Sequence, residues 1–374
     1  MQYYVTLTTN CNLQCKYCYE KCCNDIGVGL GELRIDYSVP SSISYDIAEL
    51  KRFCERDPSS TIVFYGGEPL LRIDLIEQIM RNVNAGKFMM QTNGLLLHKL
   101  SSSLLGKMDT ILVSVDGGRE LTDYYRGTGV YDRVIRNLKD LRAKGFTGEV
   151  IARMTVGRET RIDQEVASLL SSETLFDSIH WQLDALFWQS DYDKGNFFKW
   201  VEGEYNPRVR KLVSMWIDQM KRQGRVQRIY PLIGIMESLL LSEPARLRCG
   251  AGWTMFNIQT DGNITPCPVM AGMKDYYLGN IKDTNPDELS TRAVYVSKPC
   301  TNCSIYPVCG GRCLYANVTK LWGEEGFALV CGTVRELVEA LKLVVPEISS
   351  LISERKISLQ DFSYPKYNSC EIIP

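Results

Sequence analysis

Residues 11–18 decide the fold of this chain, and they read CNLQCKYC. Cys11, Cys15 and Cys18 stand at C-x3-C-x2-C spacing, directly after an extended apolar run, YYVTL, at residues 3–7. Three closely spaced thiols can hold three irons of a four-iron cluster on one short loop. A cluster that only transfers electrons is usually closed by four thiolates. The spacing therefore predicts a cluster whose fourth iron is open to a bound substrate.

A structural zinc site is the alternative interpretation of the same spacing. Such sites normally have a fourth Cys or His close by. The chain has two histidines, His98 and His180, and neither is adjacent to the loop. An iron–sulfur cluster is therefore favoured over zinc.

Length and composition describe an ordinary soluble protein with too many cysteines. The chain has 374 residues, 45% hydrophobic and 23% charged, which suits one large α/β domain and a smaller one. Its net charge of −1 predicts no general attraction to nucleic acid or to anionic membranes. There is no apolar run of membrane-spanning length and no secretion signal. Fourteen clustered cysteines then indicate metal binding in a reducing compartment, so we expect a cytoplasmic protein.

Strand-like and helical segments alternate along the first half. Such alternation predicts a parallel sheet with right-handed crossovers, and sheets of this kind bind ligands at the carboxyl ends of their strands. The expected strands are residues 3–7, 61–65, 87–91, 109–115, 149–156 and 178–186, and the expected helices are 70–83, 131–144 and 161–171.

Unusual residues follow four of these strands. They are the cysteine loop, Gly66-Gly67-Glu68-Pro69, Thr92-Asn93-Gly94 and Asp116-Gly117-Gly118. Glycines allow a ligand close to the backbone, and the carboxylate or backbone carbonyls of the second motif can bind an ammonium group. Arg126 and Arg153 are candidate partners for carboxylate or ribose oxygens, although such residues often form structural ion pairs. The glycine-rich segment 27–31, GVGLG, is expected to be a surface excursion.

The second half changes in character. Residues 205–241 have the pattern of a connecting pair of amphipathic helices. Residues 249–331 hold seven cysteines with many Gly and Pro, a composition better held together by metal than by a core. Residues 333–352 form a plausible amphipathic helix, followed by a polar tail.

Together, the cysteine loop, Gly-Gly-Glu-Pro and Thr-Asn-Gly closely resemble the radical S-adenosylmethionine (SAM) superfamily. The resemblance implies a partial (β/α)6 TIM-type barrel. It also implies a [4Fe–4S] cluster on Cys11, Cys15 and Cys18, bound at its open iron by S-adenosylmethionine. Reductive cleavage of that cofactor would yield a 5′-deoxyadenosyl radical that abstracts a substrate hydrogen. The implied cofactor contacts are Tyr17 (against the adenine), Gly66, Gly67, Glu68 and Pro69 (at the amino group), Asn93, Ser114, Arg126, Arg153 and Leu183.

The later cysteines resemble a SPASM domain, which carries two auxiliary [4Fe–4S] clusters. The resemblance implies three clusters in all and domains at 1–200 (radical SAM barrel), 201–245 (helical connector), 246–340 (SPASM) and 341–374 (helix and tail). A zinc ribbon at residues 300–313 is the alternative. By resemblance, Cys249, Cys267 and Cys313 bind the first auxiliary cluster, and Cys300, Cys303, Cys309 and Cys331 bind the second.

The sequence departs from relatives at two positions. No extra cysteine follows Cys249, so the first auxiliary cluster has three assigned thiolates; its fourth iron is either open to a substrate thiolate or carboxylate or capped by another group. Sulfatase-maturing relatives place an Asp general base directly after the cysteine that matches Cys267, and here that residue is Pro268. The next carboxylate along the chain is Asp275, which does not occupy the position of that general base. Cys22, Cys23 and Cys370 are either caps or ordinary thiols.

We therefore expect a radical SAM/SPASM enzyme that modifies a ribosomally made peptide or a protein. Its product would be a thioether, a carbon–carbon crosslink or an oxidised residue, with the auxiliary clusters accepting an electron. The alternatives are a formylglycine-generating sulfatase maturase, an iron–sulfur electron carrier and a zinc-binding adaptor. The expected partners are a flavodoxin or ferredoxin reductant and, since only ten residues precede the cysteine loop, a separate leader-binding protein unless the enzyme binds the peptide directly. Six aromatics either line a substrate channel or pack in the core: Trp181, Phe187, Trp188, Phe197, Phe198 and Trp200.

Overall fold

The computed structural model describes residues 1–18, 33–171, 175–184, 194–366, 368 and 370. They form two compact units. The first consists of Met1–Ala152, Thr174–Phe176 and Gly250–Tyr295, and the second of Arg153–Glu173, Asp177–Cys249 and Val296–Pro374. The predicted boundaries at 200, 245 and 340 stay predictions, because these units interleave along the chain.

A largely parallel sheet forms the core of the first unit. Strands β1 (Gln2–Thr8), β2 (Thr61–Gly66), β3 (Lys87–Thr92) and β4 (Thr110–Ser114) are parallel neighbours in the order β4-β3-β2-β1. β5 (Glu149–Val156) begins in this unit, where the N–H of Glu149 donates to the carbonyl of Asp109 at 3.0 Å. Every residue of β1 is buried, as expected for a strand that is covered on both faces. The mixed α/β fold with a parallel core is thus confirmed.

The cysteine-rich half contributes strands to the same sheet, and the sequence pattern did not predict these strands. β7 (Met255–Ile258) pairs in parallel with the other side of β1, and the antiparallel strands β8 (Asn263–Thr265) and β9 (Gly279–Asn280) follow. All four residues of β7 are buried. Residues 250–295 therefore share the apolar core of the first unit and do not depend on metal alone for their fold.

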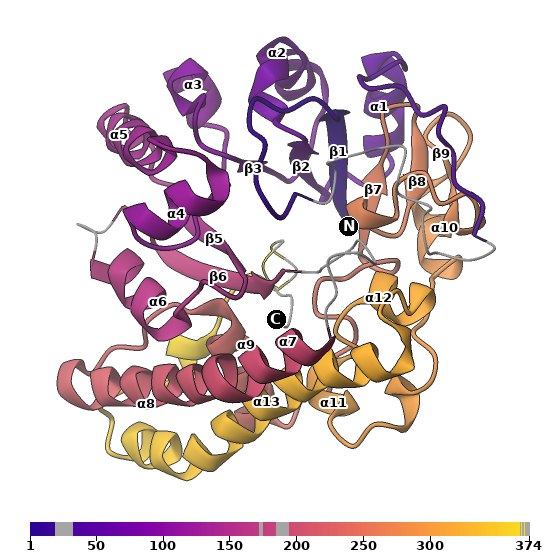
Figure 1. The fold of residues 1–374 in the computed structure, drawn as a ribbon. Helices are drawn as coiled ribbons and strands as arrows, with labels where there is room; N and C mark the ends of the chain where they lie inside the picture. Colours follow the sequence, from indigo (N-terminus) through magenta and orange to yellow (C-terminus); the bar gives the residue numbers. More distant parts are fainter. Residues whose placement is uncertain (19–32, 172–174, 185–193, 367, 369, 371–374) are drawn as a thin grey trace. The chain divides into compact units, whose positions relative to one another are not determined.

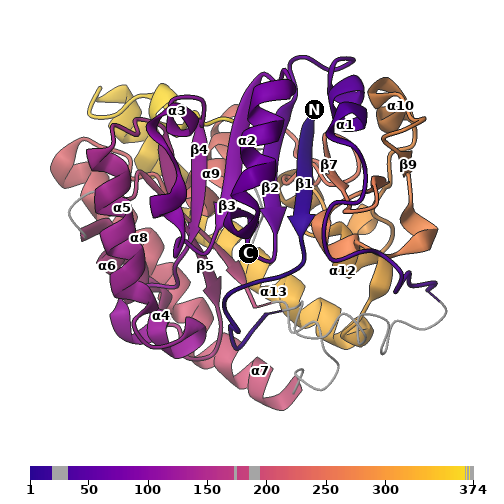
Figure 2. The same ribbon diagram turned by 90° about the horizontal axis from the view of Figure 1, so that it is seen from above.

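Helices run along the outer face of β1–β4 (Figures 1 and 2). α2 shows why: Leu75, Ile76, Ile79 and Met80 repeat at helical spacing and are buried against the sheet. The expected helix 70–83 begins as a 3-10 turn, because Pro69 starts it and the Glu68 side chain caps it. The helices and 3-10 turns of this unit are α1 (Ile47–Cys54), η2 (Pro69–Arg72), α2 (Ile73–Asn82), η3 (Leu97–Lys99), α3 (Ser102–Leu105), α4 (Arg119–Arg126), α5 (Val130–Ala143), η6 (Pro268–Met270), η7 (Lys274–Tyr276) and α10 (Pro286–Thr291).

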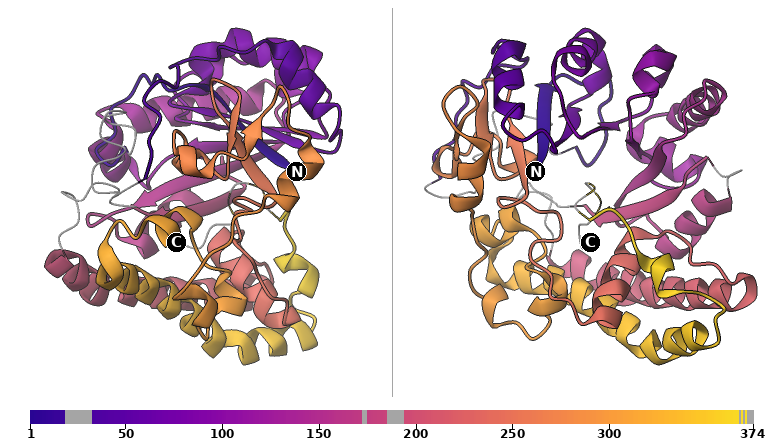
Figure 3. Two further views of the ribbon diagram at one scale, coloured as in Figure 1. Left: turned by 90° about the vertical axis from the view of Figure 1, so that its right-hand side faces the viewer. Right: turned by 180° about the vertical axis from the view of Figure 1, so that it is seen from behind.

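The second unit is mainly helical. The end of β5 lies beside β6 (Ser178–Leu183). α8 (Asn206–Gln223) runs along α13 (Gly323–Ser353), a pairing visible in Figure 3. α13 begins ten residues earlier than predicted and contains Pro346. The other helical elements of the second unit are α6 (Ile162–Ser171), α7 (Lys194–Trp200), η5 (Val201–Tyr205, a π-helical turn), α9 (Tyr230–Leu241), η8 (Cys300–Asn302), α11 (Tyr306–Cys309), α12 (Leu314–Thr319) and η9 (Leu359–Phe362).

Most of the described aromatics near β6 belong to the core of the second unit. Trp181 is fully buried, and its indole N–H donates to the Tyr205 hydroxyl at 3.0 Å. Phe197 and Trp200 are buried as well, whereas Phe198 is half exposed. Phe187 and Trp188 lie outside the described residues, as does the 27–31 segment. Within the described part of the chain, no helix has the length and apolar character needed to cross a membrane.

Candidate active site

The cysteine loop leaves the carboxyl end of β1. Cys11 is exposed, and Cys15 and Cys18 are half-buried. The N–H of Cys18 donates to the carbonyl of Cys15 at 3.1 Å, which curls the end of the loop. Burial raises the pKa of Cys15 to about 11; the Arg126 charge opposes this shift, while Cys18, Asp116 and Cys11 reinforce it. The three thiols are therefore close enough to interact electrostatically.

A buried ion pair between Asp116 and Arg126 stabilises the cysteine loop. The Asp116 carboxylate accepts two hydrogen bonds from Arg126, at 2.8 and 3.0 Å, and a third from the Tyr17 hydroxyl at 2.7 Å. Asp116 is fully buried and Arg126 is 7% exposed. The N–H of Lys16 donates to the carbonyl of Tyr125 at 2.9 Å, which fastens the same part of the loop to α4. Arg126 thus carries a structural ion pair, and its predicted contact with the cofactor stays a prediction, as does that of Tyr17.

The glycines of Gly66–Pro69 are required by the chain itself. Gly66 has φ +143°, and a Cβ there would lie 2.1 Å from the carbonyl oxygen of Thr8. A Cβ on Gly67 would lie 2.4 Å from the carbonyl oxygen of Thr9 and 2.5 Å from that of Asn10. The close neighbour of both glycines is thus the backbone leaving β1, and the expected approach of a ligand to them stays a prediction.

The Glu68 carboxylate points into the protein. It is fully buried and accepts hydrogen bonds from the N–H of Leu70 at 2.9 Å, the N–H of Asn93 at 2.8 Å and the Thr92 hydroxyl at 2.8 and 3.0 Å. Burial raises its pKa, against the effect of these hydrogen bonds. In this structure the Glu68 carboxylate joins the ends of β2 and β3 and is not presented to an external ammonium group. Backbone carbonyls remain the predicted ammonium ligands.

Asn93 connects this motif to the cysteine loop. Its Nδ2 donates to the side-chain oxygen of Asn12 at 2.8 Å and lies 3.8 Å from the Cys11 sulfur. Its own Oδ1 accepts from the N–H of Leu95, which fixes the orientation of the amide. The structure therefore brings together the cysteine loop, Gly66–Pro69 and Asn93, as the sequence predicted.

Three further residues that are predicted to contact the cofactor lie on strands. Ser114 is half-buried as the last residue of β4 in the first unit. Arg153, on β5, donates to the side-chain oxygen of Gln182 at 2.9 Å, and Leu183 is buried on β6. Arg153 and Leu183 belong to the second unit, and their roles stay predictions.

The four cysteines predicted for the second auxiliary cluster all belong to the second unit. Cys300 and Cys303 share a tight turn in which the N–H of Cys303 donates to the carbonyl of Cys300 at 3.0 Å. Cys309 ends α11, and Cys331 lies on α13. Burial raises the pKa of Cys331 to about 11, with smaller contributions from the other three thiols. Their assignment to one shared cluster stays a prediction.

The other three predicted ligands are divided between the units. Cys267 lies in the first unit, just before η6, whereas Cys249 and Cys313 lie in the second. Cys249 and Cys267 are buried and Cys313 is half-buried. Cys370 is buried in the second unit, and Cys54 is buried on α1. Cys22 and Cys23 fall outside the described residues.

The predicted ligands are all cysteines. A [4Fe–4S] cluster is held by cysteine thiolates, each of which binds a different iron, so the residue type fits such clusters. Among the described residues, no three His, Cys, Asp or Glu side chains are grouped as ligands of one metal ion.

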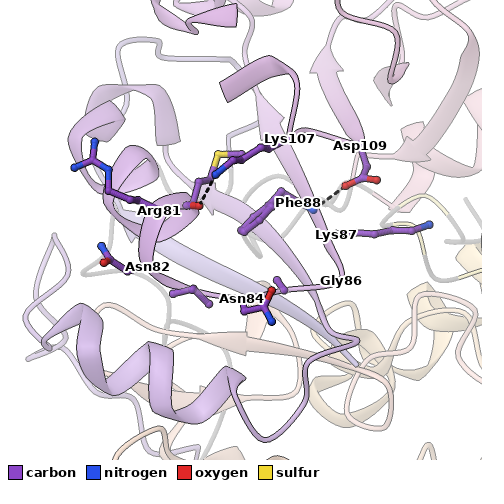
Figure 4. A pocket seen from close by; sticks show the side chains of 11 residues that line it. Arg81, Asn82, Asn84, Gly86, Lys87, Phe88, Lys107 and Asp109 are labelled. Atoms are coloured by element: carbon purple, nitrogen blue, oxygen red, sulfur yellow. Dashed lines mark hydrogen bonds between the residues drawn. The ribbon is translucent and has the colours of Figure 1, made fainter. Parts of the chain in front are cut away.

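A separate hollow in the first unit lies at the opposite, amino end of β3 (Figure 4). Two of its charged side chains are engaged locally: Lys107 donates to the carbonyl of Met80 at 3.3 Å, and Asp109 accepts from the N–H of Phe88 at 2.9 Å. It therefore does not belong to the candidate active site.

Two family models match the chain. The model of the radical SAM superfamily matches residues 5–170, and that of SPASM, an iron–sulfur cluster-binding domain, matches residues 249–313. This chain carries a radical SAM domain. It is accordingly a radical SAM enzyme with a SPASM domain that binds S-adenosylmethionine and iron–sulfur clusters.

Relatives of this radical SAM protein differ in what they do. An uncharacterized protein of Archaeoglobus fulgidus is 24% identical over 92% of this chain and 81% of its own length. A probable GTP 3′,8-cyclase of Methanocella arvoryzae is 31% identical over 38% of this chain, and an Fe-coproporphyrin III synthase of Methanosarcina barkeri is 28% identical over 45%. The alignments span less than half of those two proteins, 44% and 40% respectively.

Solved structures show the same fold over more of the chain. The structure of anSMEcpe with bound AdoMet and a Cp18Cys peptide matches 94% of this chain and 99% of its own, with a TM-score of 0.69 and 17% identity. Streptococcus suis SuiB bound to its precursor peptide SuiA matches 83% of this chain and 71% of its own, with a TM-score of 0.54 and 15% identity. At these identities the likeness is one of fold.

Proposed function

We propose that this radical SAM enzyme abstracts a hydrogen from a residue of a ribosomally made peptide or a protein and installs a thioether, a carbon–carbon crosslink or an oxidation. The observation that carries the proposal is the grouping of Cys11, Cys15 and Cys18 on one loop at the end of β1, beside Gly66–Pro69 and Asn93. S-adenosylmethionine bound to a reduced cluster supplies radical chemistry.

The chain's own residues hold and orient this site. The three thiols would carry the first cluster, and the Asp116–Arg126 pair keeps their loop in place through Tyr17. Glu68 ties the ends of β2 and β3 together, so the backbone that would receive the cofactor's amino group is rigid before binding. Preorganised positioning of this kind lowers the cost of reaching a reactive geometry.

Two auxiliary clusters complete the proposal. Cys300, Cys303, Cys309 and Cys331 would close one cluster with four thiolates, which suits electron transfer. Cys249, Cys267 and Cys313 would hold the other, whose fourth iron is either open to a substrate thiolate or carboxylate or capped by another group. One of the two clusters would accept the single electron released when the substrate radical is oxidised.

A peptide substrate is supported by the fold neighbours that bind peptides. anSMEcpe and SuiB share their folds with 94% and 83% of this chain, and both were determined with a peptide bound. The probable GTP 3′,8-cyclase of Methanocella arvoryzae aligns with 38% of it. Coverage therefore favours a peptide or protein substrate over a nucleotide.

The formylglycine-generating alternative meets an obstacle at the expected base. Pro268 follows Cys267 and opens η6. A proline side chain has no group that can accept a proton. Asp275 is held by Arg34, whose backbone N–H donates to it at 2.8 Å and whose Nε donates at 2.6 Å. Backbone and side-chain hydrogen bonds from Arg34 lower the pKa of Asp275, which makes it a poor base. Mass loss of a Cys- or Ser-containing sulfatase peptide to the aldehyde would nevertheless reverse this ranking.

The experiment that tests the proposal has two readouts. Anaerobically reconstituted protein is incubated with S-adenosylmethionine and dithionite, and 5′-deoxyadenosine is measured. A short peptide encoded beside the gene is then added, and its mass change is recorded, with and without a flavodoxin or ferredoxin reductant and any neighbouring leader-binding protein. We expect cofactor cleavage in both cases and a mass change with the peptide. Absence of cofactor cleavage would refute the enzyme assignment.

Iron and sulfide analysis separates the non-enzymatic alternatives. Three four-iron clusters require about twelve irons and as many sulfides per chain. Zinc without sulfide would support the adaptor alternative. Full iron content without cofactor cleavage would support an electron carrier.

A further inference from the structure

We propose that the Asn317 amide and the Arg335 guanidinium raise the reduction potential of the second auxiliary cluster by donating hydrogen bonds to its cysteine sulfurs. The inference rests on the proposed assignment of Cys300 and Cys303 to that cluster. It adds two residues that bind no iron themselves but favour the one-electron-reduced state of the cluster.

Asn317 is held so that its donor faces sulfur. Its Nδ2 lies 3.4 Å from the Cys300 sulfur, and the residue is 2% exposed on α12. The N–H of Ser297 donates to the Asn317 Oδ1 at 2.7 Å, while Nδ2 also donates to the carbonyl of Ser297 at 3.2 Å. The Ser297 N–H must face an acceptor, so the amide cannot be flipped, and the NH2 group is directed at Cys300.

Arg335 supplies a charged donor to the neighbouring ligand. Its Nη2 lies 3.5 Å from the Cys303 sulfur, and its Nη1 donates to the Ser304 hydroxyl at 3.3 Å. Arg335 is one turn along α13 from Cys331, so the helix that carries a ligand also carries this donor. Because Arg335 is exposed, water screens its charge more than it screens the buried amide of Asn317.

The effect on potential follows from charge. Reduction adds one electron to the cluster and makes it more negative, so N–H dipoles and a guanidinium beside the sulfurs stabilise the reduced state more than the oxidised one. Hydrogen bonds to sulfur, net charge and solvent exposure are among the factors that set iron–sulfur potentials. Removing either donor should make the potential more negative.

The test is an anaerobic redox titration of the reconstituted full chain, poised with dithionite and mediators and followed by EPR. Cys11→Ala, Cys15→Ala and Cys18→Ala are combined in a second background to remove the first cluster's signal. At a fixed potential, Asn317→Ser should lower the reduced-to-oxidised ratio of the second auxiliary cluster about tenfold, which is about 59 mV for one electron. Arg335→Leu should lower it by a smaller factor, and Arg335→Lys should recover part of that loss.

Lys342→Leu removes an exposed cation from the same helix and is the matched control, expected to leave the ratio unchanged. Iron and sulfide are measured in every variant. If Asn317→Ser loses the cluster, the two Arg335 variants, whose side chain is exposed, decide the question. A full cluster with an unchanged potential in the donor variants would overturn this inference alone. Wild-type protein that lacks the four irons would instead overturn the cluster assignment.

Discussion

The two cysteine groups use the same ligand chemistry in opposite surroundings. Cys11, Cys15 and Cys18 lie on an accessible loop at strand ends, with the carboxylates of Glu68 and Asp116 among the charges that act on their thiols. Cys300, Cys303, Cys309 and Cys331 lie among short helices and α13, with the Asn317 amide directed at one sulfur and the Arg335 guanidinium at another. Cys11 is open to solvent, as a ligand beside a cofactor site needs to be, whereas Cys300 and Cys309 are buried, which suits electron transfer.

Removing a ligand from each group should give the largest contrast. Cys15→Ala is expected to abolish cleavage of S-adenosylmethionine, by at least about 10³-fold or roughly 4 kcal/mol of barrier. Cys309→Ala should retain cofactor cleavage and lose peptide modification. Both are measured as 5′-deoxyadenosine and peptide mass with dithionite present. Equal loss of cleavage in the two variants would contradict the division of roles.

The buried ion pair behind the first loop is the next target. Asp116→Asn leaves the Arg126 charge uncompensated in the protein interior, so we expect it to reduce the free energy of unfolding by about 3–5 kcal/mol. Asp74→Asn, which breaks the exposed pair with Arg72, should cost less than about 1 kcal/mol. Chemical denaturation of the proteins without clusters measures both. Similar values for the two variants would show that Asp116 does not anchor the loop.

The close backbone approach at Gly67 predicts a smaller loss. Gly67→Ala places a Cβ against the carbonyls of Thr9 and Asn10 and should cost about 3 kcal/mol, because backbone must shift. It should also weaken S-adenosylmethionine binding, measured by equilibrium dialysis. Gly203→Ala, where a Cβ meets nothing within 4 Å, is the control and should cause no loss. Unchanged stability in Gly67→Ala would contradict the argument that the nearby backbone of Thr9 and Asn10 requires a glycine here.

The smallest effect is a difference in the rate of iron loss. Cys11 is exposed, whereas Cys300 and Cys309 are buried. During brief exposure to a chelator, the first cluster should therefore lose its EPR signal before the second auxiliary cluster does. The signals are followed over time in wild type and in Arg335→Leu. Loss of both at one rate would indicate that burial does not distinguish the two sites.

Much of this molecule could be predicted locally. The alternating pattern placed β1 to β6 within a few residues, since apolar runs and their Gly- or Asp-containing ends are short-range signals. Cysteine spacing predicts the first ligand group for the same reason, whereas the division of the later cysteines between two clusters comes from the resemblance to a SPASM domain and stays a prediction. The pattern missed β7, because Met255–Ile258 is only four residues long and its pairing with β1 joins residues some 250 positions apart.

Short-range sequence patterns are enough to predict the chemistry that we propose for this chain. Thiols at fixed short spacing and glycines at a strand end need no distant neighbour to be recognised. The tertiary structure decided what those residues do: Glu68 turned inward to join β2 and β3, Arg126 was paired with Asp116, and Asn317 was directed at Cys300. A buried charge or amide takes the partner that desolvation demands, and that partner is chosen by the fold.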